Sequence, residues 1–198
     1  MTPYIKSWHT MSAKKLGKTF GYLQPKEIEL LDRLVKTLPK DPLVINLGAG
    51  VGTSAMTILE ARDDVYVVTV DMEGGESPLG GLLNEEHILR AANWLHRRSA
   101  ICSESTAAGK NWWRFKEEPW WRIKVDMVVH DAAHDYELVI TEIEAWLPRV
   151  RAKGIIAVHD YCSPHWVCVV NAVDETLRAR FKYIDQQEMM IAFRKEKL

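Results

Sequence analysis

The sequence predicts an α/β fold in which helices cover both faces of a mostly parallel sheet, a three-layer sandwich. Short apolar runs alternate with amphipathic helical stretches along most of the chain. A glycine-rich turn joins the first apolar run to a helix. The 198 residues, 47% of them hydrophobic, are enough for one buried core and few for two. We therefore expect a single domain over residues 1–198, with residues 1–24 as an N-terminal lid or substrate-binding segment.

The first half of the chain begins with a predicted helix at Pro25, a residue typical of a first helical turn. Its apolar residues share one face: Ile28, Leu31, Leu34, Val35 and Leu38. Residues 42–47 (PLVINL) and 65–70 (VYVVTV) predict buried strands, and residues 53–63 predict a helix between them. A glycine-rich loop, 73–81, follows.

The middle of the chain continues the alternation. We expect Asn84 to cap a helix, with acidic residues in its first turn and Arg97 and Arg98 near its end. Residues 99–103 predict a strand less clearly, and residues 125–130 (VDMVVH) predict one strongly.

The last third of the chain predicts two more helices and a hairpin. The first helix presents Tyr136, Val139, Ile140, Ile143 and Leu147 on one face. Gly154 is expected to end that helix before a strand at 155–159, and a second helix is expected near 168–180. Residues 181–185 and 189–194 predict an antiparallel pair.

Composition and charge limit the class of protein. The formal net charge of −1 gives no indication of a nucleic-acid or membrane partner, although a local basic patch is compatible with it. Three cysteines without ligand or disulfide spacing favour a reduced, cytoplasmic setting. No segment has the length and hydrophobicity of a signal peptide or membrane span.

Eight tryptophans are many for this length, and four lie in residues 111–121 (NWWRFKEEPWW). These rings either fill the core at the edge of the sheet or form an aromatic wall around a flat substrate. Exposed tryptophans would favour a homodimer.

The glycine loop VINLGAGVGTS (44–54) suggests a ligand site. Gly48, Gly50 and Gly52 allow a ligand to approach bare backbone at the start of a helix. A dinucleotide-binding GxGxxG motif would need a third glycine at the position of Thr53. Asp71 ends the second predicted strand, where a carboxylate can bind both hydroxyls of a ribose.

Three His-Asp pairs follow predicted strands: His130-Asp131, His134-Asp135 and His159-Asp160. The carboxyl ends of parallel strands share one edge, so these pairs lie where such sheets bind ligands. His134 has the chemistry of a general base near neutral pH. We interpret Asp135 as a helix cap and His130 as a strand-end residue. His165 and Trp166 are candidates for the wall of an acceptor pocket.

These segments together resemble the class I S-adenosylmethionine (SAM)-dependent methyltransferases. The residues that carry the resemblance are NLGAGVGTS, Asp71 in VTVDM, SEST (103–106) and the block HDAAHDYELVITEIEAWLPRVRAKGIIAVHDY (130–161). The last block is similar to the small-molecule O-methyltransferase branch, which includes catechol and sugar O-methyltransferases. The resemblance implies a Rossmann-like, seven-stranded sheet whose C-terminal strand is antiparallel.

The resemblance also implies roles for individual residues. The cofactor-binding set would comprise Asn46, Gly48, Ala49, Gly50, Gly52, Thr53, Ser54, Asp71, Met72, Glu104 and Asp131. His134 would be the general base of a direct in-line methyl transfer to a small hydroxylated acceptor, with Asp131 beside it as a second catalytic residue. In metal-dependent members, carboxylates at the places of Asp131 and Asp160 hold Mg²⁺; here His159 precedes Asp160, where many such enzymes have an acid.

Four points remain open at this stage. Asn46 stands where the family usually has an acid, which keeps a non-catalytic SAM-binding or interaction protein in consideration. An NAD-dependent oxidoreductase would share the glycine loop. Asp131 could contact the SAM amino group, bind the metal or cap the helix near Tyr136. The acceptor could also be a nitrogen, because His134 could accept a proton from either atom.

Overall fold

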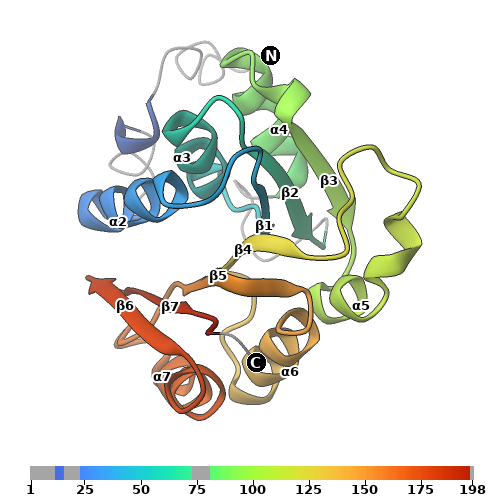
Figure 1. Cartoon of the computed structure of the whole chain (residues 1–198). Coiled ribbons are helices and arrows are strands. Elements are labelled where there is room, and N and C mark those ends of the chain that lie inside the picture. Colours follow the sequence, from blue (N-terminus) through green and yellow to red (C-terminus); the bar gives the residue numbers. More distant parts are fainter. Residues whose placement is uncertain (1–11, 16–22, 73–80, 197–198) are drawn as a thin grey trace.

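The computed structural model describes residues 12–15, 23–72 and 81–196. Its seven-stranded sheet has the order β3-β2-β1-β4-β5-β7-β6 (Figure 1). The strands are β1 (Leu43–Leu47), β2 (Tyr66–Asp71), β3 (Arg98–Cys102), β4 (Val125–His130), β5 (Val150–Val158), β6 (Lys182–Gln187) and β7 (Met190–Arg194). Strands β1 to β5 pair in parallel, and β7 runs antiparallel to both β5 and β6. The predicted sheet is confirmed.

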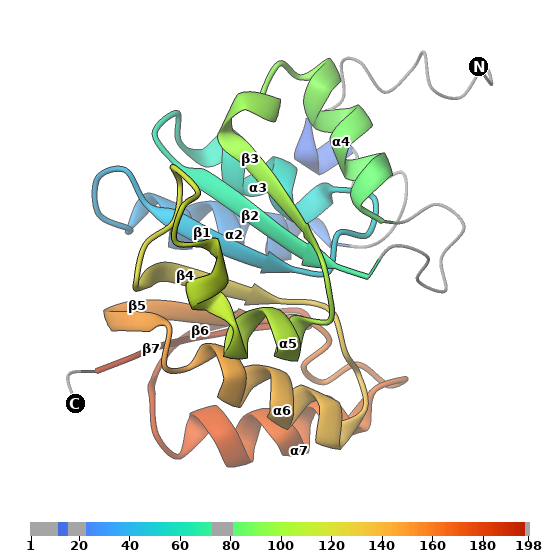
Figure 2. The ribbon, with the colours of Figure 1, turned by 90° about the vertical axis from the view of Figure 1, so that its right-hand side faces the viewer.

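Helices cover both faces of the sheet (Figures 1 and 2). On one face lie α2 (Pro25–Lys36), α3 (Thr53–Ala61) and α4 (Leu82–Ala91), and on the other α5 (Ser105–Lys110), α6 (Tyr136–Trp146) and α7 (Val167–Val173). Successive side chains of a strand point to opposite faces, so Val44 packs with α2 and α3 while Ile45 packs with α6 and α7. The three-layer α/β sandwich is therefore confirmed.

Asn84 does not cap α4 as predicted. The helix begins at Leu82 after Gly81, whose φ of 116° suits glycine, and it ends at Ala91. Arg98 instead opens β3 and donates from Nε to the buried Glu85 carboxylate at 2.7 Å. Glu85 belongs to the predicted acidic first turn, but its fully buried side chain serves this tertiary ion pair.

Gly154 does not end the preceding helix, which stops at Trp146. It lies inside β5, opposite the shift in strand register between Val125 and Met127. A Cβ on Gly154 would lie 2.7 Å from the Val150 side chain and 3.0 Å from the Asp126 carbonyl oxygen. The glycine therefore permits close backbone approach within a strand.

Part of the tryptophan-rich segment fills the core, whereas Trp113 in the same segment is 58% exposed. Trp112, in a 3₁₀ turn after α5, is buried, with ring centroids 5.4 Å from Trp146 and 5.6 Å from Trp120. Trp120 stacks on Tyr66, the first residue of β2. This cluster therefore lies toward the end of β2 opposite Asp71. The core interpretation is confirmed for Trp112 and Trp120, and the aromatic-wall interpretation is wrong for them.

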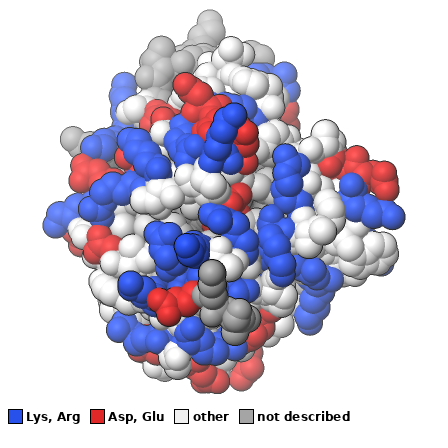
Figure 3. Space-filling model, viewed as in Figure 1, with Lys and Arg blue, Asp and Glu red and all other residues white. Residues whose placement is uncertain are grey.

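The surface seen in Figure 3, at the amino ends of the parallel strands, is rich in Lys and Arg. Burial and the neighbouring Lys124 both lower the pKa of Lys195. This face is therefore basic, although the formal net charge of the whole chain is −1.

Two segments lie mostly outside the described residues: the predicted N-terminal lid segment 1–24 and the glycine-rich loop 73–81. In the part of the chain that the structure does describe, no helix combines the length and hydrophobicity required to cross a bilayer.

Candidate active site

Most of the predicted site residues lie at the carboxyl edge of the parallel strands, to which the arrowheads of β1 and β4 point in Figure 2. Gly48 to Gly52 follow β1, Asp71 ends β2 and Met72 follows it, Glu104 lies beyond β3, Asp131 follows β4, and His159 and Asp160 follow β5. Asp131 N–H donates to the Leu47 carbonyl, and His159 N–H donates to the His130 carbonyl. Backbone bonds thus tie the β1, β4 and β5 ends into one surface.

The glycine loop between β1 and α3 has a backbone that only glycine adopts readily. Gly48, Gly50 and Gly52 have φ values of 90°, 49° and 87°. Gly48 is also confined: a Cβ there would lie 2.1 Å from the Asp131 carbonyl oxygen. The loop passes so close to the end of β4 that no side chain fits at this point.

Asp71 lies directly against this loop. The backbone N–H of Ala49 donates to Asp71 Oδ2 at 2.6 Å. Burial raises the pKa of Asp71, and the Ala49 hydrogen bond opposes that rise. Met72 next to it is 56% exposed, and Glu104 is exposed beyond the neighbouring strand. A carboxylate and an apolar side chain thus stand together at the strand end predicted to hold a nucleoside.

Asn46 supports the loop from within β1. It is fully buried, and its Nδ2 donates to the Gly48 carbonyl at 2.8 Å. Its Oδ1 has no hydrogen-bond partner among the described residues, and neither does Oγ1 of buried Thr53 at the start of α3. Buried polar atoms are rarely left unsatisfied, so these two atoms beside the loop favour a polar ligand or water there. Ser54, also buried, follows in the first turn of α3.

His134 lies on the connection between β4 and α6, and its Nε2 is 2.9 Å from Asp160 Oδ2. An ionised carboxylate only accepts hydrogen bonds, so Nε2 carries a hydrogen, and in the neutral imidazole Nδ1 then has the free lone pair. Trp166 stacks on the imidazole, with ring centroids 4.6 Å apart. Asp160 has a φ of 60°, a strained conformation for a residue with a side chain. One neighbour thus fixes the tautomer of His134 and another fixes its ring plane.

The contact between His134 and Asp160 shifts the pKa of both side chains. The hydrogen bond that His134 donates to Asp160 raises the pKa of His134 above its ordinary value, against the opposing effect of burial. Burial acts to raise the pKa of Asp160, but hydrogen bonds from His134 and His159 hold it below its usual range. His134 is therefore a stronger base than a free imidazole.

The other His-Asp residues take the structural roles predicted for them. The side chain of Asp135 caps α6 by accepting from the Glu137 N–H, which rules out the helix-capping role considered for Asp131. His130 is buried, with Nε2 2.7 Å from Glu142 Oε2, and the same oxygen accepts from the Ala133 N–H. Glu142 thereby anchors the connection that carries His134.

Sequence reasoning missed Glu27. This fully buried residue of α2 lies with Oε2 3.3 Å from His159 Nε2. Its oxygens also accept the backbone N–H groups of Gln24 and Met189. The spacing of Gln24 and Glu27 is that of a helix capping box, which signals a helix start but gives no hint of the contact with His159.

The residues fit SAM better than they fit Mg²⁺. A polar nucleoside cofactor is compatible with three features of the site: the glycine loop without side chains, the carboxylate of Asp71 and the unpaired Oδ1 of Asn46. Ligand atoms of Asp131, His134 and Asp160 lie within 4.8 Å of one another, but Mg²⁺ prefers six oxygen ligands. Here Asp160 Oδ2 already lies 2.9 Å from His134 Nε2 and 3.3 Å from His159 Nδ1.

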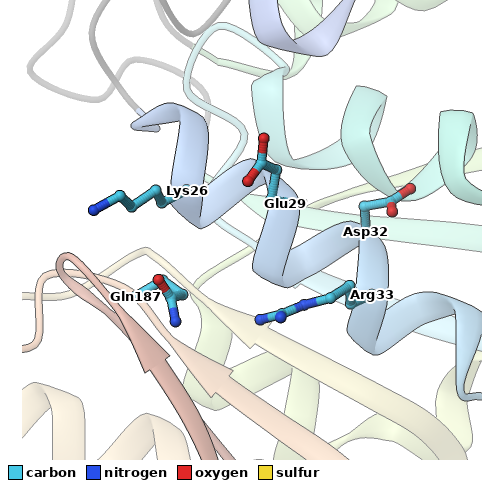
Figure 4. Close-up of a pocket in the computed structure, with 5 residues that line it drawn as sticks. All are labelled: Lys26, Glu29, Asp32, Arg33 and Gln187. Carbon is cyan, nitrogen blue, oxygen red and sulfur yellow. The ribbon is translucent and has the colours of Figure 1, made fainter.

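A separate pocket of roughly 270 Å³ lies between α2 and the end of β6, lined by Lys26, Glu29, Asp32, Arg33 and Gln187 (Figure 4). Its cations are already paired: Lys26 with Glu188 at 3.2 Å and Arg33 with Asp185 at 2.7 Å. It contains none of the predicted site residues.

Comparison with known proteins identifies the chain's family. A family profile described as a methyltransferase domain matches residues 45–161, more than half of the chain. The chain belongs to this methyltransferase family. The match begins in β1 and ends just beyond Asp160, so it includes the glycine loop, Asp71 and His134. Between the two enzyme classes considered from the sequence, the match favours a methyltransferase over an oxidoreductase. No curated protein matches the sequence.

Solved structures share the fold of this methyltransferase at low identity. A Staphylococcus aureus protein assigned as a caffeoyl-CoA O-methyltransferase is 13% identical with a TM-score of 0.69, and the match covers 98% of both chains. An O-methyltransferase from Bacillus cereus in complex with S-adenosylhomocysteine (SAH) is 13% identical with a TM-score of 0.66, and the match covers 98% of this chain and 92% of that one. A Clostridium thermocellum protein assigned as an rRNA methylase is 15% identical with a TM-score of 0.62, over 84% and 95%.

Proposed function

We propose that this methyltransferase is SAM-dependent and transfers a methyl group to a hydroxyl of a small acceptor, with His134 as general base. The observation that carries the proposal is the placement of the His134–Asp160 pair at the same sheet edge as the glycine loop and Asp71. A cofactor bound along that edge and a base beside it are the two requirements of the reaction. The names of the neighbouring O-methyltransferases favour oxygen as the methylated atom.

The cofactor would lie against the loop from Gly48 to Gly52. Asp71 would accept hydrogen bonds from the ribose hydroxyls. Met72 would cover the adenine ring, and Glu104 would face the adenine amine. Asp131 would be available to the amino group, because its backbone already borders Gly48. Bound SAM supplies an activated methyl group, so the protein's own task is alignment and proton removal.

Proton removal falls to Nδ1 of His134. Since Nε2 donates to Asp160, Nδ1 is the atom that can accept the proton of an acceptor hydroxyl. Asp160 then stabilises the imidazolium that forms. Trp166, which is 44% exposed and stacked on the imidazole, would offer an aromatic surface to the acceptor.

The test is calorimetric titration with S-adenosylhomocysteine (SAH), comparing the wild type with Asp71→Ala and Asp63→Ala. We expect Asp71→Ala to weaken SAH binding by about 10-fold to 100-fold, because charge-assisted hydrogen bonds contribute roughly 1.5–3 kcal/mol. Asp63 is exposed near the opposite end of β2, so Asp63→Ala should bind SAH like the wild type.

Two outcomes would contradict the proposal. If the wild type binds NADH and not SAH, the glycine loop serves another cofactor. If Asp63→Ala and Asp71→Ala weaken SAH binding equally, Asp71 does not contact the ribose. Formation of SAH from SAM in an acceptor screen then distinguishes an enzyme from a protein that only binds the cofactor.

A further inference from the structure

His159 is surrounded by carboxylates at the centre of the site. Its side chain is 6% exposed. Nδ1 lies 3.2 Å from Asp131 Oδ1 and 3.3 Å from Asp160 Oδ2, and Nε2 lies 3.3 Å from Glu27 Oε2. Both ring nitrogens of His159 therefore face carboxylate oxygens, which act as hydrogen-bond acceptors when they are ionised. This arrangement favours the imidazolium form, in which both nitrogens carry hydrogens.

The surroundings stabilise this charge. Burial disfavours a charge on His159, but the carboxylates of Asp131, Asp160 and Glu27 within 3.3 Å of its ring nitrogens compensate for it. A buried charge is tolerated when it is paired and hydrogen-bonded. Without His159, the carboxylates of Asp131 and Asp160 would face each other with no cation between them.

The position of the His159 ring leaves little room for a divalent metal ion at Asp131 and Asp160. A divalent ion shared by Asp131 and Asp160 would need the same oxygens that His159 Nδ1 already faces. The ion would also lie next to the His159 ring, whose other nitrogen, Nε2, contacts Glu27. A metal ion and an imidazolium in contact with the same carboxylate oxygens repel each other strongly in a buried site.

We infer that the imidazole ring of His159 occupies the place of a divalent metal between Asp131 and Asp160, and that this site works without Mg²⁺. Glu27 is a positioning residue in this arrangement, since it fixes the far nitrogen of the ring. The acceptor hydroxyl is then activated by His134 alone. The inference deepens the proposed function and rests on it only for the catalytic consequence.

The experiment is a titration of the apo protein with Mn²⁺ and with Mg²⁺, followed by calorimetry, on the wild type, His159→Asp and His87→Asp. His87 is an exposed residue of α4, so it controls for the same change of side chain elsewhere. We expect neither the wild type nor His87→Asp to show a saturable site. His159→Asp replaces the cation by a third oxygen ligand and should bind Mn²⁺ at least about 100-fold more tightly.

Thermal unfolding provides a second readout. His159→Asp without metal should melt below the wild type, because Asp131, Asp160 and Glu27 lose their counter-charge. A hundredfold excess of Mn²⁺ over its Kd should raise the melting temperature of this variant by about 5–10 °C and leave the wild type unchanged. If His159→Asp does not fold, His159→Asn removes the cation without adding charge and should still gain at least about tenfold in Mn²⁺ affinity.

A saturable Mn²⁺ or Mg²⁺ site in the wild type, lost in Asp131→Asn, would overturn the inference. So would a folded His159→Asp that binds no more metal than His87→Asp. Neither result depends on SAH binding, so failure of the metal inference and failure of the proposed methyl transfer are separately visible.

Discussion

Replacing His134 with asparagine is expected to lower the turnover number for methyl transfer by about 10²–10⁴-fold, the usual contribution of a general base. The loss should fall on kcat, because His134 lies on the connection between β4 and α6, outside the glycine loop, and the proposed function gives it contact with the acceptor and not with the cofactor. SAH affinity measured by calorimetry should therefore stay at the wild-type value. His96→Asn is the matched control, since His96 lies in the 3₁₀ turn before β3, at the opposite edge of the sheet.

The pH profile separates a general base from a residue that only shapes the pocket. A base works in its neutral form, so the rate should fall as pH drops below the pKa of His134, which Asp160 raises above the ordinary histidine value. Removing the Asp160 charge lowers that pKa, so Asp160→Asn should move the acid limb of the kcat profile to lower pH. A profile unchanged in Asp160→Asn, or a full rate in His134→Asn, would exclude His134 as the base.

The fold could be predicted because its signals are local. Alternation of apolar strands with amphipathic helices identified the sheet, and the parallel arrangement then placed the ends of β1, β2, β4 and β5 at one edge. The glycine loop and Asp71 were found for the same reason, since each stands at a strand end and needs no partner to be recognised.

The errors and omissions arise where tertiary contacts override local preference. Asn84 has the chemistry of a helix cap, but Gly81 starts the helix earlier and Arg98 is held by the buried Glu85. The contact between Glu27 and His159 joins residues 132 positions apart. No periodicity or motif in the sequence reports such a distance, so the charge arrangement around His159 could only be seen in the folded chain.

Replacing Gly48 with alanine is expected to have the largest effect on both stability and cofactor affinity. The new Cβ would stand 2.1 Å from the carbonyl oxygen and 2.8 Å from the carbonyl carbon of Asp131. Both are backbone atoms held by the Asp131 N–H bond to Leu47, and Gly48 itself donates to the Val70 carbonyl. Neither side can move without breaking strand-end bonds, so we expect a loss of about 3 kcal/mol or more in unfolding free energy and at least tenfold in SAH affinity.

Gly81→Ala is the control that isolates the collision. Gly81 also has a positive φ, 116°, but a Cβ there would meet nothing within 4 Å. This variant should therefore show backbone strain alone, a loss of roughly 1–3 kcal/mol in unfolding free energy. Urea unfolding of the two variants gives the comparison. Equal losses in both would mean that positive φ, and not the approach of Gly48 to Asp131, is what the loop requires. A greater loss in Gly48→Ala would show that the cofactor cradle depends on bare backbone packed directly on the strand end that carries Asp131.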